Sequence, residues 1–166
     1  MNQQQNMTQL AAQVGEELQA RNQMLVTAES CTGGMIGAVC TDVSGSSSWF
    51  FGGIISYANE AKMRALSVKE ETLSSCGAVS EETVKEMCAG ALALGGDVAV
   101  AVSGVAGPNG GSVEKPVGCV YIGWQWRDEE AVAMRFQFVG DRQAVREATV
   151  LAALQGIKKR YENLKK

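Results

Sequence analysis

The sequence of 166 residues contains no histidine. This absence excludes a Ser-His-Asp triad and any metal site built on histidine, so an activated serine must take its base from lysine, tyrosine or a carboxylate. The five cysteines are odd in number and form no C-x-x-C pair. They therefore predict reduced, mostly buried thiols, and neither a disulfide framework nor a zinc site is indicated.

Long apolar runs and basic blocks are scarce as well. No apolar run approaches the roughly 18 residues of a membrane span, and the first residues lack the basic and apolar regions of a signal peptide. The net charge is −3, and the only basic runs are the short segments 158–160 and 165–166. This composition argues against a membrane protein or a nucleic-acid binder and predicts a soluble, cytoplasmic protein with one domain over residues 1–166.

Hydrophobic spacing and turn residues predict helices interleaved with strands. Helices are expected over 7–21, 32–42, 59–66 with Asn59 as cap, 81–94 and 142–164, with a helical turn over 69–76. Strands are expected over 24–29, 49–58, 97–104, 117–126 and 131–139, the last two as a hairpin. This order predicts an α/β protein, a three-layer α/β/α sandwich on a mixed, mostly parallel sheet of about five strands.

Two glycine-rich segments, 30–34 and 104–118, each follow a predicted strand. In open α/β sheets the ligand crevice lies beyond the carboxyl ends of the strands, so we expect both segments at one site. Glycines 104, 107, 110 and 111 would allow a phosphate or an amide to approach the backbone closely. The G-K-[ST] signature of a Walker loop is absent.

Ser30 lies between a predicted strand and the paired glycines Gly33 and Gly34, a position typical of a nucleophile. We expect the backbone N–H groups of Cys31, Thr32 and Gly33 to be unpaired in the first helical turn, where they would receive a phosphate or an oxyanion. Serine is also a common helix cap, and that interpretation stays open.

Lys62 falls in the first turn of a predicted helix, where a cation opposes the helix dipole. Burial and the helix end both favour its neutral amine, which suits a base for Ser30; the alternative is a solvated surface lysine. Tyr57 is predicted to face the same pocket as a donor or aromatic wall, or to be a half-buried strand residue. Ser103 ends its strand as Ser30 does, so its hydroxyl either orients a proton or satisfies loop backbone.

Arg142 and Arg146 lie four residues apart on one face of the last predicted helix and suit a substrate phosphate. Pairing with acidic neighbours on the surface is the alternative. Cys31 is a second candidate nucleophile if the helix start lowers its pKa. We rank it after Ser30, because a small buried cysteine fits the position as easily.

Several sequence blocks together resemble the CinA C-terminal domain family, which includes free-standing nicotinamide-nucleotide amidohydrolases. They are TAESCTGG at 27–34, DVSGSSSWFFGGIISYANEAK at 42–62, GAVSEE at 77–82, SGVAGPNGGSVEKPVG at 103–118 and GDRQAVR at 140–146. The resemblance covers nearly the whole chain. It implies an α/β/α fold, no metal or other cofactor, frequent homodimers, and here the form without an N-terminal molybdopterin-binding-like domain.

The resemblance also implies an activity, the removal of ammonia from nicotinamide mononucleotide to give nicotinic acid mononucleotide. Carried over by motif, the family's serine falls on Ser30, its lysine on Lys62 and its tyrosine on Tyr57, while Ser103 stands where many relatives have threonine. Ser30 would attack the carboxamide carbon with Lys62 as base. The residues expected to contact the nucleotide are Cys31, Thr32, Gly33, Gly34, Gly104, Gly107 and Arg142.

Two alternatives remain beside this enzyme. One is a catalytically silent nucleotide-binding module that uses the same loops, and the other is an amidase with Cys31 as nucleophile. A purely structural role is disfavoured, because two glycine-rich loops after strands cost chain entropy without a ligand.

Overall fold

The computed structural model describes residues 2–166, so Met1, the first residue of the predicted domain, lies outside the described residues. The helices are α1 (Gln3–Gln19), α2 (Met35–Thr41), α3 (Asn59–Leu66), α4 (Glu70–Cys76), α5 (Glu81–Leu94) and α6 (Arg142–Leu164), with a short 3₁₀ helix at Ser46–Ser48. The strands are β1 (Leu25–Glu29), β2 (Phe50–Ile55), β3 (Val98–Gly104), β4 (Cys119–Trp126) and β5 (Val132–Gln137).

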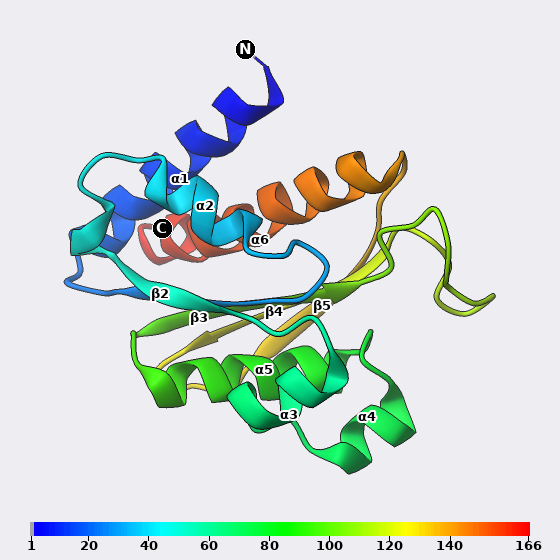
Figure 1. Ribbon diagram of the computed structural model, residues 1–166. Coiled ribbons are helices and arrows are strands. Elements are labelled where there is room, and N and C mark those ends of the chain that lie inside the picture. Colours follow the sequence, from blue (N-terminus) through cyan, green and yellow to red (C-terminus); the bar gives the residue numbers. More distant parts are fainter. Residues whose placement is uncertain (1) are drawn as a thin grey trace.

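The strands form one sheet in the order β2-β1-β3-β4-β5. Strand β1 runs parallel to both β2 and β3, whereas β4 is antiparallel to β3 and to β5. Helices α1, α2 and α6 cover one face of the sheet, and α3, α4 and α5 lie on the other (Figure 1). The predicted α/β/α sandwich on a five-stranded mixed sheet is confirmed, with its parallel pairing confined to β2, β1 and β3.

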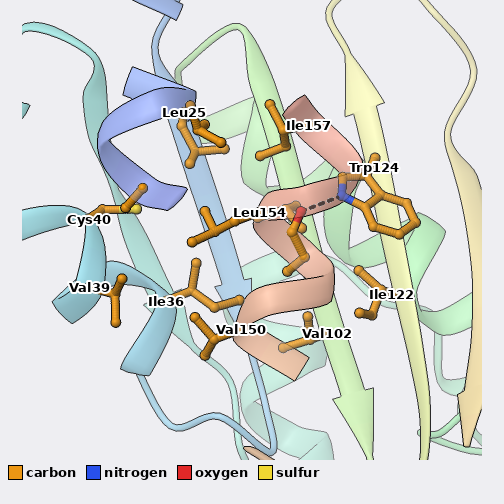
Figure 2. Close-up of a cluster of buried hydrophobic side chains, with 14 of the residues drawn as sticks. Leu25, Ile36, Val39, Cys40, Val102, Ile122, Trp124, Val150, Leu154 and Ile157 are labelled. Carbon is orange, nitrogen blue, oxygen red and sulfur yellow. Dashed lines mark hydrogen bonds between the residues drawn. The ribbon is translucent and has the colours of Figure 1, made fainter. Parts of the chain in front are cut away.

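The two faces of the central strands build two apolar clusters, because side chains alternate along a strand. In β3, Val98, Val100 and Val102 face α1, α2 and α6, while Ala99 and Ala101 face α3 and α5. Figure 2 shows the first cluster, in which Trp124 of β4 lies against α6. Its indole nitrogen donates to the carbonyl oxygen of Ala153 at 2.9 Å, so this buried polar atom is satisfied.

Two helices begin at residues other than those predicted. Helix α2 starts at Met35 and not at Thr32, because Gly33 and Gly34 adopt φ values of 58° and 99°, in the left-handed region. Helix α3 is capped by the extended Ala58, and Asn59 is its first residue. Lys62 nevertheless stays within the first turn, since its N–H donates to the Ala58 carbonyl.

Strand β2 lies at the edge of the sheet, whereas the apolar sequence WFFGGIISYA over 49–58 predicts a buried strand with a glycine bend. Its residues alternate between half-buried and exposed, whereas β1 is buried throughout. Trp49, just before β2, is nevertheless part of the core, and Phe51 is about half exposed. Because β2 ends the sheet, only one of its long sides pairs with a neighbour.

The sheet register separates the two ends of the fold. Gly104 at the carboxyl end of β3 pairs with Val120, near the start of β4, while Val98 pairs with Trp126 at the end of β4. The turn between β4 and β5 therefore lies at the sheet end opposite to the carboxyl ends of β1, β2 and β3. None of the helices described within residues 2–166 is long and apolar enough to cross a membrane.

Candidate active site

The carboxyl ends of the three parallel strands bring together segments far apart in the chain. Ser30 follows β1, and its N–H donates to the carbonyl of Val102 in β3 at 3.1 Å. Ser56 follows β2, and its N–H donates to the carbonyl of Glu29 in β1 at 2.8 Å. These bonds extend the sheet pairing by one residue on each side of β1, and they fix the point from which the Ser30 side chain leaves.

Lys62 of α3 reaches Ser30 across this sheet end. Its Nζ lies 2.9 Å from the Ser30 Oγ, 2.8 Å from the Ser56 carbonyl oxygen and 3.0 Å from the Tyr57 carbonyl oxygen. The side chain is only 1% exposed, and no carboxylate contacts its nitrogen among the described residues. Burial disfavours the ammonium ion, so the pKa of Lys62 is lowered from its ordinary value.

The turn after Ser30 differs from the expected row of three free donors. The Gly33 N–H donates to the Ser30 carbonyl at 3.0 Å and closes the turn, and Thr32 is completely buried. Within residues 2–166, the N–H groups of Cys31 and Thr32 donate to no carbonyl, so only Gly33 departs from the prediction of three unpaired donors. A trans peptide points its N–H away from its C=O, so the Cys31 N–H is directed away from the bond that closes the turn.

Glu29 is a buried side chain of this site that the sequence motifs do not single out. It is 2% exposed, and its Oε1 accepts from the Thr32 hydroxyl at 2.6 Å and the Ile36 N–H at 2.9 Å. Its Oε2 accepts from the Gly37 N–H at 3.0 Å. The signal present in the sequence is an acidic residue at the end of the otherwise uncharged strand LVTAE.

Arg146 lies on the outer side of the same turn. Its Nε donates to the Cys31 carbonyl at 3.2 Å, and its Nη2 donates to the Thr32 carbonyl at 3.0 Å. Its Nη1 donates to Gln143. The side chain therefore holds backbone of the turn, which differs from the expected pairing with Arg142 around a phosphate.

Arg142 connects three segments at the mouth of the site. Its Nη1 donates to the Gly107 carbonyl at 2.8 Å and its Nη2 to the Tyr57 hydroxyl at 3.2 Å. Tyr57 is 60% exposed, and its hydrogen bond with Lys62 is made by its backbone carbonyl. Arg142 also lines a cleft of about 560 Å³. The other lining residues are Ala106, Pro108, Val117, Gly140, Asp141 and Gln143.

The remaining predicted residues form no hydrogen bond with Lys62 within the described part of the chain. Ser103 is buried close to the end of β3, and within residues 2–166 its hydroxyl bonds to neither Ser30 nor Lys62. Gly104 packs against β4, where a Cβ would lie 2.5 Å from a Val120 methyl group. Gly34 faces Ile55, and a Cβ at Gly34 would lie 2.9 Å from the Ile55 Cδ1.

Cys31 does not have the low pKa expected of a reactive thiolate. Its side chain is buried, and burial raises the pKa of the thiol to about 11. The sulfur is therefore protonated at neutral pH. This geometry favours Ser30 over Cys31 as the nucleophile. Among residues 2–166, no group of three or more acidic, cysteine or histidine side chains is arranged to hold a metal ion.

Comparison with known proteins identifies the family of this chain. The family model described as the CinA C-terminal domain matches residues 7–161. The chain belongs to the CinA C-terminal domain family. The domain is 51% identical over 148 residues to the nicotinamide-nucleotide amidohydrolase PncC of Escherichia coli K12, covering 89% of this chain and 90% of that protein.

Two further relatives extend the likeness. This CinA domain is 50% identical over 151 residues to nicotinamide-nucleotide amidohydrolase PncC of Pseudomonas putida, covering 90% of this chain and 94% of that protein. The crystal structure of the competence damage-inducible protein A of Klebsiella pneumoniae has a TM-score of 0.89 and 40% identity, with 92% of this chain and 95% of that chain covered. The chain thus has the fold of this Klebsiella protein and is similar in sequence to these relatives over nearly its full length.

Proposed function

We propose that this chain hydrolyses the carboxamide of nicotinamide mononucleotide to nicotinic acid mononucleotide and ammonia. The names of the relatives support an amidohydrolase of nicotinamide nucleotides. The observation that carries a serine/lysine mechanism is the buried contact of 2.9 Å between Lys62 Nζ and Ser30 Oγ. Recycling of pyridine nucleotides is the corresponding role in the cell.

The surroundings of Lys62 suit a neutral amine. Such an amine has two N–H donors and one lone pair, and the carbonyls of Ser56 and Tyr57 take both donors. The lone pair is then directed at the third neighbour, the Ser30 hydroxyl. In this state the Ser30 O–H donates to Nζ, so the same contact prepares removal of the serine proton.

The proposed reaction has two halves. Ser30 Oγ attacks the carboxamide carbon while Lys62 takes the hydroxyl proton, and Lys62 then gives that proton to the departing nitrogen, which leaves as ammonia. In the second half Lys62 takes a proton from water, the resulting hydroxide attacks the acyl ester, and the proton returns to Ser30 Oγ. The Cys31 N–H, next to the nucleophile, is the proposed donor to the oxyanion in both halves.

We propose that the cleft beside Arg142 holds the ribose and phosphate. A guanidinium group has five N–H donors, and contacts to Gly107 and Tyr57 leave several for a phosphate oxygen. Tyr57 would keep Arg142 in position from the rim. Ser103 would orient a proton or water near Ser30, since both follow strands that end at the same edge and both lie on the α3 side of the sheet by strand alternation.

Ammonia release from nicotinamide mononucleotide by the purified protein tests the proposal. Wild-type protein should turn over, and Ser30→Ala and Lys62→Met should each lose about 10³-fold or more in kcat. Lys69→Met is a matched control on an exposed lysine. If folded wild-type protein binds the nucleotide without releasing ammonia, the silent binding module replaces the enzyme.

Ser103 has a separate test. Ser103→Ala should lower kcat, and Ser103→Thr, which keeps the hydroxyl, should restore it. Equal kcat values for Ser103→Ala and wild type would remove Ser103 from the mechanism. A homodimer and a cytoplasmic location stay predictions, to be checked by sedimentation and by cell fractionation.

A further inference from the structure

We infer that Glu29 is a positioning residue that holds the oxyanion-binding turn 30–34 from its buried side. This inference rests on the proposed function and assigns a part of the site beyond Ser30 and Lys62. Glu29 and Ser30 are adjacent but point to opposite faces of the sheet, Ser30 toward Lys62 of α3 and Glu29 toward α2. The carboxylate therefore acts on the turn without contacting the substrate.

Glu29 takes the place of a side-chain cap for α2. The cap position is Gly34, which has no side chain, and the second and third N–H groups of the helix donate to Glu29. A serine or aspartate at the cap position ordinarily accepts hydrogen bonds from these same N–H groups. Because the cap comes from the last residue of β1, it ties the start of α2 directly to the strand that Ser30 follows.

Thr32 transmits this restraint to the turn. Its hydroxyl donates to Glu29 Oε1 at 2.6 Å, while its carbonyl accepts from Arg146 at 3.0 Å. The residue is thus held from two sides by opposite charges and is completely buried. The peptide between Ser30 and Cys31 lies one residue before it, so fixing Thr32 fixes the direction of the Cys31 N–H.

Glutamine cannot reproduce these contacts, although it matches the shape of glutamate. One oxygen of Glu29 faces the Ile36 N–H and the other faces the Gly37 N–H. A glutamine amide must turn its own NH₂ group toward one of these two donors in either orientation. Glu29→Gln therefore places two donors face to face and displaces the turn, and a misplacement of about 1 Å costs about 10²-fold in rate.

The experiment compares Glu29→Gln and Thr32→Val with Thr32→Ser, which keeps the hydroxyl. We expect Glu29→Gln and Thr32→Val to lower kcat for nicotinamide mononucleotide by about 10- to 100-fold with KM within about threefold. Thr32→Ser should recover most of the loss. The acid limb of the pH profile should keep its midpoint, because Lys62 and its three hydrogen-bond partners are unchanged.

A matched control separates positioning from folding. Thr83 is also completely buried, and its hydroxyl donates to the Gly77 carbonyl at 2.7 Å, with no hydrogen bond to the turn 30–34 or to Lys62 within residues 2–166. Thr83→Val should lower the melting temperature but not kcat per folded molecule. The inference is overturned if Thr32→Val loses no more kcat than Thr83→Val, or if its loss comes with a shifted acid limb. If Glu29→Gln fails to fold, the comparison of Thr32→Val with Thr83→Val tests the inference by itself.

Phosphonylation of Ser30 by a small fluorophosphonate distinguishes failure of this inference from failure of the proposed function. The reaction needs Ser30, Lys62 and the turn, but no nucleotide. If the wild type is labelled at Ser30 without releasing ammonia, the proposed substrate is wrong. Slower labelling of Thr32→Val than of Thr83→Val would then still support the role of Glu29, and equal labelling would reject it.

Discussion

The guanidinium of Arg142 donates to the hydroxyl of Tyr57 at 3.2 Å, joining the start of α6 to the segment after β2. The same side chain holds the Gly107 carbonyl in the loop after β3. Three segments distant in the sequence thus meet at one cation beside the cleft. A cation fixed in this way loses little side-chain freedom when it binds an anion, which suits it to a substrate phosphate.

Replacement of Arg142 tests this role. Arg142→Ala should raise the KM for nicotinamide mononucleotide by about 10- to 100-fold, since a hydrogen bond to a charged group contributes about 1.5–3 kcal/mol. Because Arg142 is proposed to hold the phosphate and forms no hydrogen bond with Ser30 or Lys62 within residues 2–166, kcat should change much less. Nicotinamide riboside, which lacks the phosphate, is the matched substrate and should show little difference between the variant and the wild type. A similar loss for both substrates would contradict phosphate binding by Arg142.

The pH dependence should report Lys62. The base must be neutral, and burial lowers its pKa, so kcat/KM should rise with pH along an acid limb whose midpoint lies below the ordinary lysine value of about 10.4. At lower pH Lys62 is an ammonium ion, which donates a hydrogen bond to Ser30 and cannot take the serine proton. A profile measured by ammonia release in buffers of constant ionic strength checks this. A rate that falls as pH rises toward 9 would contradict a neutral lysine.

Thiol chemistry should leave the activity intact. The Cys31 thiol is buried, with its pKa raised to about 11, whereas Cys76 is the half-buried cysteine. Iodoacetamide at pH 7 should therefore modify Cys76 first, as mass spectrometry of peptides will show. Cys31→Ala should retain kcat within about fivefold, because it keeps the backbone N–H. Loss of activity comparable to that of Ser30→Ala would restore Cys31 as the nucleophile.

The packing of α3 on α5 should limit what Gly90 tolerates. A Cβ at Gly90 would lie 2.0 Å from the Leu66 carbonyl oxygen, so Gly90→Ala must push α3 away. We expect a loss of about 1–3 kcal/mol in the free energy of unfolding and a lower kcat, because α3 carries Lys62. Gly37→Ala is the control for stability alone, since a Cβ at Gly37 would have its nearest neighbour at 3.4 Å. Urea denaturation measures the free energy of unfolding of both variants. Equal values for Gly90→Ala and Gly37→Ala would contradict this packing argument.

The layers of the fold are accessible from the sequence because they depend on local patterns. Apolar runs bounded by glycines predict the strands, and the alternation of helices and strands predicts the sandwich. Ser30 stands out because it lies between a predicted strand and paired glycines, and Lys62 stands out because a lysine in a first helical turn opposes the helix dipole. The structure brings these two side chains into contact across 32 residues of chain.

Other parts of the site depend on contacts that no local pattern encodes. Arg146 contacts the turn 115 residues before it, so its preference for carbonyls over a phosphate appears only in the folded chain. The predicted start of α2 is wrong because it assigns the paired glycines to the helix, whereas their positive φ values form a turn before it. Glu29 accepts hydrogen bonds from N–H groups that lie seven and eight residues later in the chain. The usual capping motifs span about three residues, so no sequence pattern indicates this role.

The turn between β4 and β5 is a position where the chain can be opened or attached to a support without altering the candidate active site. Its backbone bends at Asp128, where φ is 65°, and Arg127 and Glu129 on either side are held by contacts to Gly96 and Arg160. New chain termini opened at Asp128, or a tether attached there, would emerge at the sheet end opposite to Ser30. A molecule immobilised on a solid support through this turn would present its cleft to the flowing solution.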